Sequence, residues 1–284
     1  MNKILSNIGL GAMLLSMAAC GNEADTPVVD YMGMREITVS VAGPESRTTI
    51  DYDGADVSHL VWSEGDEIAY VTDFQGDVWR TAKVKQNDFT AQVPQGATAA
   101  NRLFVVYPAD GVAGKSLGDV ELQTLNPAVL DLDKDFDGKR LPMMGQTYVP
   151  SESKASAVFD FKSSVVRLCV DSLDHGKEML KEVTLSANEP LTASYRMSKD
   201  GASVTPGSKS ITMSVKTAKP DECTLGELVK RDRYVYFVVN RGEYTGLTLK
   251  VTTDAGTYTF PNGKMDVSTP GRTLYRMNVT LDKP

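Results

Sequence analysis

Residues 36–49 have the sequence EITVSVAGPESRTT, which alternates apolar and polar side chains and then turns. Three apolar residues would share one face of an extended strand: Ile37, Val39 and Val41. A Gly-Pro pair follows and ends the strand, because both residues favour turns. Arg47 lies just beyond this turn, so the stretch predicts an amphipathic strand with an arginine behind it.

The same alternation recurs along the chain, at residues 191–197, 211–215, 247–251 and 275–281. Residues 234–239, YVYFVV, are continuously apolar, which is typical of a central strand covered on both faces. Helical periodicity is confined to two short candidates, 175–183 and 224–231. The sequence therefore predicts an all-β fold built of sandwiches.

The length and charge of the chain limit the number of domains and the kinds of partner that it can have. It has 284 residues, enough for one large or two ordinary domains, a net charge of −7 and a pI of about 5.0. That charge argues against a nucleic-acid partner, since phosphates require clustered Lys and Arg. We therefore expect a protein that binds no nucleic acid.

A polar segment in the middle of the chain predicts a domain boundary. VPSESKAS, residues 149–156, is loop-like, and FDFKSSVVRLCVDSL, residues 159–173, is a long strand that could cross between domains. We expect an N-terminal β-sandwich over 36–162 and a C-terminal β-sandwich over 163–284. Each would have about 120 residues, an ordinary domain size.

The N-terminus has the pattern of a bacterial lipoprotein. Residues 1–19 combine an early lysine with a short apolar run, as in a signal peptide. MAAC, residues 17–20, resembles a lipobox, in which Cys20 would become the new N-terminus and be acylated, for example with palmitate. A polar tether over 20–35 would follow. The alternative is a plain secretion signal with an unrelated cysteine.

Catalytic motifs are absent from the sequence. His59 and His175 lie in polar, turn-like contexts and are interpreted as surface residues. No nucleophile motif or phosphate loop is present, so we expect neither an enzyme nor a cofactor. Cys169 and Cys223 could form a disulfide outside the cytoplasm, but spacing alone does not establish the pair.

DLDKDFDGKRLPMM, residues 131–144, is the one candidate metal motif. Three alternate aspartates followed by a glycine match the opening of a calcium loop: Asp133, Asp135 and Asp137. The position of the usual bidentate glutamate holds Met144 instead, so half of the ligands are missing. A solvated acidic loop is the favoured interpretation, and calcium is the weaker one.

Several segments together resemble a known family. The first strand and Arg47 are followed by W-x-x-G-D-x-I at residues 62–68, then by FDFKSSVVRLCV at 159–170. PGRTLYRMNVTL follows near the C-terminus, at residues 270–281. In their order and spacing these segments resemble the fimbrillin family, the Mfa-like subunits of type V pili.

The resemblance implies a fold, a location and a mode of assembly. It implies two tandem transthyretin-like β-sandwiches, exported as a lipoprotein to the outer membrane and incorporated into a cell-surface fimbrium. An arginine-specific protease would cut after Arg47 and remove the strand that carries Ile37, Val39 and Val41. A strand of another pilus subunit would then fill the groove by donor-strand exchange. Arg35, which we expect to precede the strand, is the other candidate cleavage point.

The C-terminus departs from the expected pattern of a stalk subunit. Only three residues follow the last amphipathic strand, where a donor segment is expected. The candidate donor is therefore that strand itself, with the apolar residues Tyr275, Met277, Val279 and Leu281. The alternative is a pilus anchor, a tip subunit or a non-polymerising surface lipoprotein that binds glycan or host protein. Its candidate aromatic contacts are Tyr31, Trp79, Tyr107 and Tyr244, for each of which packing in the core or at an edge is the favoured interpretation.

Overall fold

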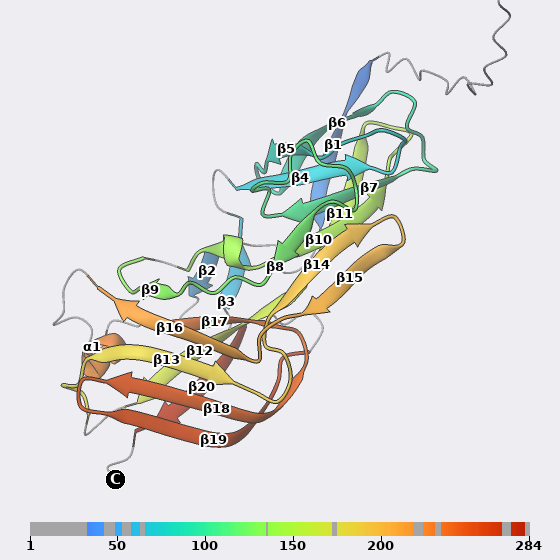
Figure 1. The fold of residues 1–284 in the computed structure, drawn as a ribbon. Helices are drawn as coiled ribbons and strands as arrows, with labels where there is room; N and C mark the ends of the chain where they lie inside the picture. The colour runs from blue at the N-terminus through green and yellow to red at the C-terminus, as the bar shows by residue number, and fades with distance from the viewer. Residues whose placement is uncertain are drawn as a thin grey trace, which may run out of the picture. The chain divides into compact units, whose positions relative to one another are not determined.

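A computed structural model describes residues 33–42, 49–52, 58–62, 66–134, 136–171, 175–217, 224–230, 234–268 and 274–281. Contacts divide the chain into two compact units, Met1–Met32 and Gly33–Pro284, and the described residues all belong to the second. Strands form nearly all of the regular structure in these ranges (Figure 1), so the predicted all-β class is confirmed.

The elements of the N-terminal half are β1 (Met34–Ala42), β2 (Thr49–Tyr52), β3 (Ser58–Val61), β4 (Glu67–Thr72), β5 (Arg80–Lys83), β6 (Asp88–Pro94), β7 (Arg102–Tyr107), β8 (Glu121–Gln123), β9 (Val129–Asp131), the 3-10 helix η1 (Gly138–Arg140), β10 (Met143–Tyr148) and β11 (Lys154–Phe161). Those of the C-terminal half are β12 (Ser163–Asp171), β13 (Leu180–Ser186), β14 (Ala193–Ser198), β15 (Gly201–Pro206), β16 (Ser210–Lys216), α1 (Leu225–Lys230), β17 (Val235–Asn240), β18 (Glu243–Thr253), β19 (Thr257–Asp266) and β20 (Leu274–Thr280).

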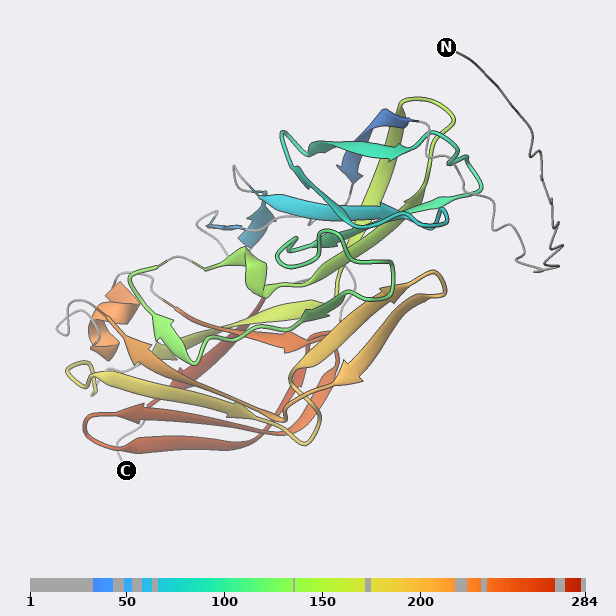
Figure 2. The ribbon, with the colours of Figure 1, turned by 45° about the horizontal axis from the view of Figure 1, so that its top comes forward.

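One curled sheet organises the N-terminal half. Its strand order is β5-β4-β7-β10-β11-β1-β6, so β5 and β6 lie at opposite ends of the sheet. These two strands are nevertheless joined by a tight turn at Gln86 and Asn87, which both have positive φ. The sheet therefore curls until its ends meet (Figure 2). Its inner face encloses the first hydrophobic core.

Two sheets face each other in the C-terminal half. One has the order β17-β12-β20 and the other β19-β18-β13-β16-β9. Their apolar side chains form the second core, in which Phe237 of β17 and Val251 of β18 are fully buried. This half is thus a two-sheet sandwich.

A third core joins the two halves. The small sheet β15-β14-β8 covers the outer face of β4, β7 and β10. Its largest buried side chains are Trp79, Phe104 and Tyr195. Residues far apart in sequence therefore share one core, because β14 comes from the C-terminal half and β7 from the N-terminal half.

The long strand predicted around residues 159–173 is present as β11 and β12, with a break at Lys162. Val165 packs in the first core and Val166 in the second. At the break, the Tyr195 hydroxyl lies 2.7 Å from the Lys162 carbonyl oxygen. The long strand therefore passes from one core to the other, while the exact domain boundary stays a prediction.

Two sequence predictions are wrong in detail. Residues 175–183 are a short helix candidate, but β13 begins at Leu180, since pairing with β16 and β18 buries Val183 and Leu185. The second helix candidate is confirmed as α1. YVYFVV was expected at the centre of a sheet, but β17 is an edge strand that pairs with β12 alone among the described strands.

Candidate functional site

The first strand, β1, is an interior strand of the curled sheet. Residues 38–42 pair in parallel with residues 154–158 of β11. On the other side, residues 34–40 pair antiparallel with β6. The backbone of β1 is thus held on both sides, and no other described strand bridges β11 to β6. Removing β1 would open the sheet at this place.

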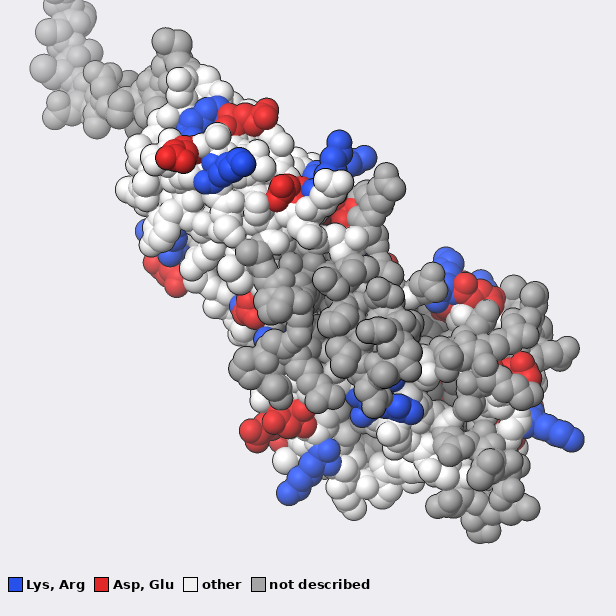
Figure 3. Space-filling view, turned by 180° about the vertical axis from the view of Figure 1, so that it is seen from behind, with Lys and Arg blue, Asp and Glu red and all other residues white. Residues whose placement is uncertain are grey.

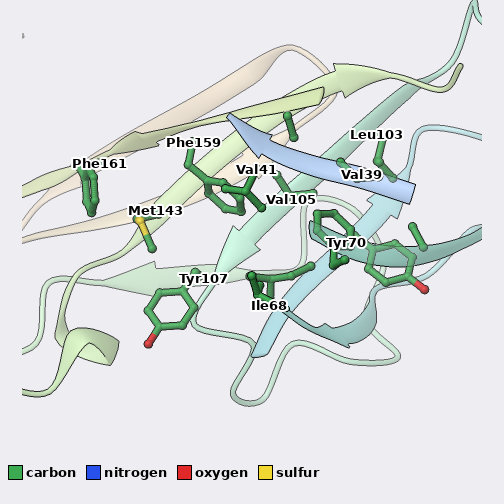
Figure 4. Close-up of a cluster of buried hydrophobic side chains, with 14 of the residues drawn as sticks. Val39, Val41, Ile68, Tyr70, Leu103, Val105, Tyr107, Met143, Phe159 and Phe161 are labelled. Carbon is green, nitrogen blue, oxygen red and sulfur yellow. The ribbon is translucent and has the colours of Figure 1, made fainter. Parts of the chain in front are cut away.

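The apolar face of β1 is completely buried. Ile37, Val39 and Val41 are 1%, 0% and 7% exposed. Figure 4 shows Val39 and Val41 in the same cluster as Tyr70 and Phe159. Burial of each of these side chains contributes roughly 1.5–3 kcal/mol relative to exposure. The predicted amphipathic strand therefore provides one wall of the first core.

The opposite face of β1 is polar and meets solvent. Glu36 and Ser40 are exposed, and Thr38 is partly exposed. Gln92 of β6 donates a hydrogen bond from Nε2 to Glu36 Oε2 at 3.1 Å. One face of the strand therefore determines its packing, and the other stays in contact with water.

The walls beside β1 include residues that the sequence analysis did not single out. Phe89, Ala91 and Val93 of β6 are buried in the same core as the apolar face of β1. Tyr70 of β4 packs on Phe89 with ring centroids 5.9 Å apart. Burial raises the pKa of Tyr70, so its hydroxyl stays neutral. The alternation in DFTAQVP, residues 88–94, was the signal that could have identified this wall.

Arg35 does not precede the strand, as was expected, but lies inside it. β1 begins at Met34, and Arg35 pairs with Val93 of β6. Its Nη2 donates to the Pro150 carbonyl oxygen at 2.7 Å and lies 3.4 Å from that of Ala97. A protease would have to pull this strand out of the sheet to reach the bond after Arg35. Arg47 and Cys20 lie outside the described residues.

The candidate donor strand forms β20. Residues 274–280 pair in parallel with residues 165–171 of β12. Tyr275 and Leu281 are buried in the second core, and Met277 and Val279 pack against it. Its apolar face is therefore used within this chain. Strands β1 and β20 share one property, since each is the parallel neighbour of the long β11–β12 strand.

The aspartates of the calcium candidate make hydrogen bonds within the fold. Asp133 accepts from the Thr217 hydroxyl at 3.3 Å. Asp137 caps η1 by accepting from the Lys139 backbone N–H at 3.0 Å. Asp135 lies outside the described residues, and Met144 is buried in β10. Among the residues that the structure describes, no three His, Cys, Asp or Glu side chains are grouped to hold a metal ion.

His175 is buried, so its prediction as a surface residue is wrong. It is 8% exposed, and its Nδ1 lies 2.6 Å from Glu178 Oε1. Tyr258 and Thr253 also donate their hydroxyls to Glu178, at 2.9 and 2.6 Å. The turn before β13 folds beneath the β18–β19 hairpin, which the local polarity of the sequence could not indicate.

The remaining candidates have different outcomes. The side chain of His59 is not described, and Tyr31 and Cys223 lie outside the described residues. Cys169 is a free thiol on β12. Trp79, Tyr107 and Tyr244 are buried and offer no exposed aromatic surface. Burial and the neighbouring Asp66 raise the pKa of Tyr107. Tyr148 of β10, which the sequence analysis did not select, is 63% exposed.

The surface charge is mixed where the structure describes it. On the face shown in Figure 3, Lys and Arg side chains lie beside Asp and Glu. One exposed ion pair of this kind joins Lys139 to Asp110 at 3.0 Å. No helix within the described ranges is long and apolar enough to cross a membrane.

The chain has an all-β fold with a buried first strand, and this fold can be compared with those of known proteins. A scan against protein-family models and a search of curated proteins found no match. Among solved structures, the chain is similar to a "putative cell adhesion protein" from Bacteroides ovatus ATCC 8483, with a TM-score of 0.55 and 15% identity over 87% of this chain and 92% of that chain.

Two further solved structures are similar. A protein described in the same words, from Bacteroides uniformis ATCC 8492, has a TM-score of 0.50 and 15% identity over 88% of this chain and 95% of that chain. A fimbrial assembly protein from Parabacteroides distasonis ATCC 8503 has a TM-score of 0.40 and 10% identity over 86% and 90% of the two chains. The first two similarities concern the fold, and at that level the resemblance to the fimbrillin family is confirmed.

Proposed function

We propose that the protein is a structural subunit of a cell-surface fimbria, assembled by donor-strand exchange after its first strand is removed. One observation carries this proposal. The N-terminal strand of the described unit is a fully integrated interior strand, and its buried face comprises Ile37, Val39 and Val41. The description of two neighbours of similar fold as cell adhesion proteins is in keeping with this role.

Loss of β1 would create a binding site for another strand. The β11 and β6 ladders would lose their shared partner, and the apolar pockets under three side chains would open to water. Unpaired strand edges beside apolar surface readily accept a new strand. An incoming strand with apolar residues at alternate positions could restore both the backbone pairing and the core.

The cleavage proposal assigns Arg47 as the release point. It follows β1 in sequence, whereas Arg35 is held within the strand. Incubation with an arginine-specific protease should yield a body that begins at Thr48 and forms filaments visible by electron microscopy. Arg47→Ala should stop both the clip and the filaments, and Arg35→Ala should stop neither. A body clipped after Arg47 that stays monomeric would refute strand exchange by this route.

The membrane anchor is a second part of the proposal. We propose export as an outer-membrane lipoprotein acylated on Cys20, with other pilus subunits and the protease as partners. Metabolic labelling with a palmitate analogue should mark the wild-type protein, and Cys20→Ser should abolish the label. Labelling of the Cys20→Ser variant at the wild-type level would refute acylation at this residue.

A non-polymerising surface protein is the alternative, and the place of β20 favours it. The apolar face of β20 is committed to its own core, so it would have to leave that core to act as a donor. An anchored subunit of this kind would bind glycan or host protein through its exposed surface. Binding to a glycan array by protein that never forms filaments after protease treatment would support this alternative.

We also propose that the protein is not an enzyme and needs no cofactor. The buried aromatic side chains are used in packing, and the carboxylate of Glu178 beside the buried His175 is occupied by hydrogen bonds from its neighbours. A structural role needs no reactive group. Hydrolase activity of the purified protein that is lost on Glu178→Gln would contradict this proposal.

A further inference from the structure

The edge strand β17 carries a continuously apolar sequence, and its open side needs protection. Residues 235–239 are all buried, and the strand pairs on one side with β12. The other side presents backbone N–H and C=O groups along a strand rich in β-branched and aromatic residues. Such an edge is a template for pairing with another chain unless something blocks it.

Asn126 occupies the place of a neighbouring strand residue beside β17. Its side-chain Nδ2 donates to the Val238 carbonyl oxygen at 2.7 Å, and its Oδ1 accepts from the Val238 N–H at 2.9 Å. A carboxamide has the same donor and acceptor as a peptide group, so it satisfies both groups of Val238 as a strand would. One side chain thus closes the centre of the edge.

Arg140 closes the adjacent position and fixes the orientation of Asn126. Its Nη2 donates to the Tyr236 carbonyl oxygen at 2.7 Å and to Asn126 Oδ1 at 3.1 Å. Its Nε donates to the Leu125 carbonyl oxygen at 3.1 Å, and the guanidinium lies 5.1 Å from the ring centroid of Phe136. Burial lowers the pKa of Arg140 to about 10, which still leaves it charged at neutral pH.

The third outward position of the edge is also occupied. The Asn240 N–H donates to the Leu191 carbonyl oxygen at 2.6 Å. The outward backbone groups at alternate residues of β17 are therefore bonded to Arg140, to Asn126 and to one backbone carbonyl. This arrangement blocks the edge although no strand among the described residues lies beside it.

The two blocking side chains come from a segment that we call the strap, residues 124–134 and 136–142. At its start, the Thr124 N–H donates to the Ala193 carbonyl oxygen at 2.9 Å. In its middle, β9 adds to β16 as a parallel edge strand. At its end, the Lys162 N–H donates to the Pro142 carbonyl oxygen at 3.1 Å. The strap is therefore anchored to β14, to β16 and to the break between β11 and β12.

We propose that the strap is a built-in lock that keeps the β17 edge from pairing with the β17 edge of a second copy of this chain. The strand between its flanking arginines has no charged residue and is apolar at successive positions, so two copies placed antiparallel bring no like charges together along residues 234–240 themselves. Asn126 and Arg140 hold the hydrogen-bonding positions that the second copy would take. This lock is a different feature from the β1 exchange proposed above, because β17 and β1 belong to different sheets, although Tyr236 and Val238 pack in the same core as β1.

The test compares Asn126→Ala with wild type in the full chain. Loss of two hydrogen bonds should raise the rate of hydrogen–deuterium exchange at the Val238 backbone N–H about tenfold. The variant should form dimers that increase with concentration in light scattering after size exclusion. It should also bind a fluorescein-labelled synthetic peptide of residues 234–240 flanked by lysines, whereas wild type should not.

Asn101→Ala is the matched control. Asn101 also accepts from a backbone N–H, that of Thr98 at 3.0 Å, but it directly precedes β7 in the N-terminal sheet and makes no described contact with β17. The Asn101→Ala variant should stay monomeric and should not bind the peptide. A folded Asn126→Ala protein that stays monomeric and ignores the peptide would overturn the proposal.

Arg140→Lys decides the matter if Asn126→Ala does not fold. Lysine keeps the charge but has no planar fork with which to bond Tyr236 and Asn126 together. We expect this variant to dimerise and bind the peptide more weakly than Asn126→Ala. If Arg140→Lys folds but neither dimerises nor binds the peptide, the proposal is overturned. It is also overturned if neither Asn126→Ala nor Arg140→Lys folds, because a lock on an edge is not required to form the core.

Discussion

The hydroxyl of Tyr70 on β4 accepts a hydrogen bond from the backbone N–H of Gln92 on β6 at 2.9 Å. These strands lie far apart in the order of the seven-stranded sheet, so the bond spans the interior of the curl. It connects β6 to the sheet by a route that does not pass through β1. This second attachment allows β6 to stay in place when β1 leaves.

Replacement of Tyr70 by phenylalanine should weaken the curl. Tyr70→Phe leaves the ring against Phe89 but removes the acceptor of the Gln92 N–H, which is then buried without its partner. We expect the free energy of unfolding to fall by about 1–3 kcal/mol in urea titrations. Tyr148→Phe, at a 63% exposed position, should leave the unfolding midpoint unchanged. Equal effects of the two substitutions would show that the bond across the core contributes nothing.

Truncation of the apolar face of β1 should destabilise the folded protein. Ile37 is 1% exposed, so Ile37→Ala removes buried methyl groups and leaves a cavity. The expected loss is about 2–5 kcal/mol of unfolding free energy, measured by chemical denaturation. Ser40→Ala on the exposed face of the same strand should change stability by less than about 0.5 kcal/mol. If both variants unfold at the wild-type midpoint, β1 is not part of the stable core.

Gly145 permits the close approach of β10 and β11. A Cβ atom at this position would lie 2.5 Å from the Val158 carbonyl oxygen, which belongs to the backbone and has little room to move. Gly145→Ala should therefore lower stability by roughly 1–3 kcal/mol in thermal or urea unfolding. Gly242→Ala is the control, since a Cβ there meets no atom within 4 Å. A Gly145→Ala protein as stable as the control would contradict this close packing.

Acid should unfold the protein partly through Glu178. Partial burial alone would raise the pKa of this carboxyl, but hydrogen bonds from Thr253, His175 and Tyr258 outweigh it and lower the pKa below 4.5. The unfolded chain therefore takes up this proton at a higher pH than the folded one does. The contribution of Glu178 is complete above about pH 4.5 and is lost as the pH falls through its lower, folded-state value.

Glu178→Gln isolates this effect. It should cost roughly 1–3 kcal/mol at neutral pH and should flatten the fall in melting temperature between neutral and acid pH. Glu152→Gln, at an exposed position, should reproduce the wild-type profile. If Glu178→Gln shows the full wild-type slope in acid, the carboxylate network is not responsible for it.

Local patterns predicted much of the fold. Alternation indicated β1, β14, β16, β18 and β20 with the correct buried faces, and a short periodic run indicated α1. The amphipathic character of the candidate site was visible in ITVSV alone. It could be predicted because the period of a strand depends only on neighbouring residues.

Other features could not be predicted from nearby residues. Arg35 was expected ahead of the strand, yet it lies within β1 and its guanidinium finds carbonyl acceptors in distant loops. His175 was placed on the surface because its neighbours are polar, yet the β18–β19 hairpin covers it. In both cases the partner lies more than 50 residues away in sequence.

The sequence by itself determined the class of the protein, the amphipathic strands and the position of an arginine behind the first of them. Only the tertiary structure decided that β1 is an interior strand, that the N-terminal sheet curls until β4 meets β6, and that YVYFVV lies at an edge sealed by Asn126 and Arg140. The physical reason is that side-chain periodicity is a local property, whereas strand pairing and the capping of an edge depend on which distant segments fold against each other.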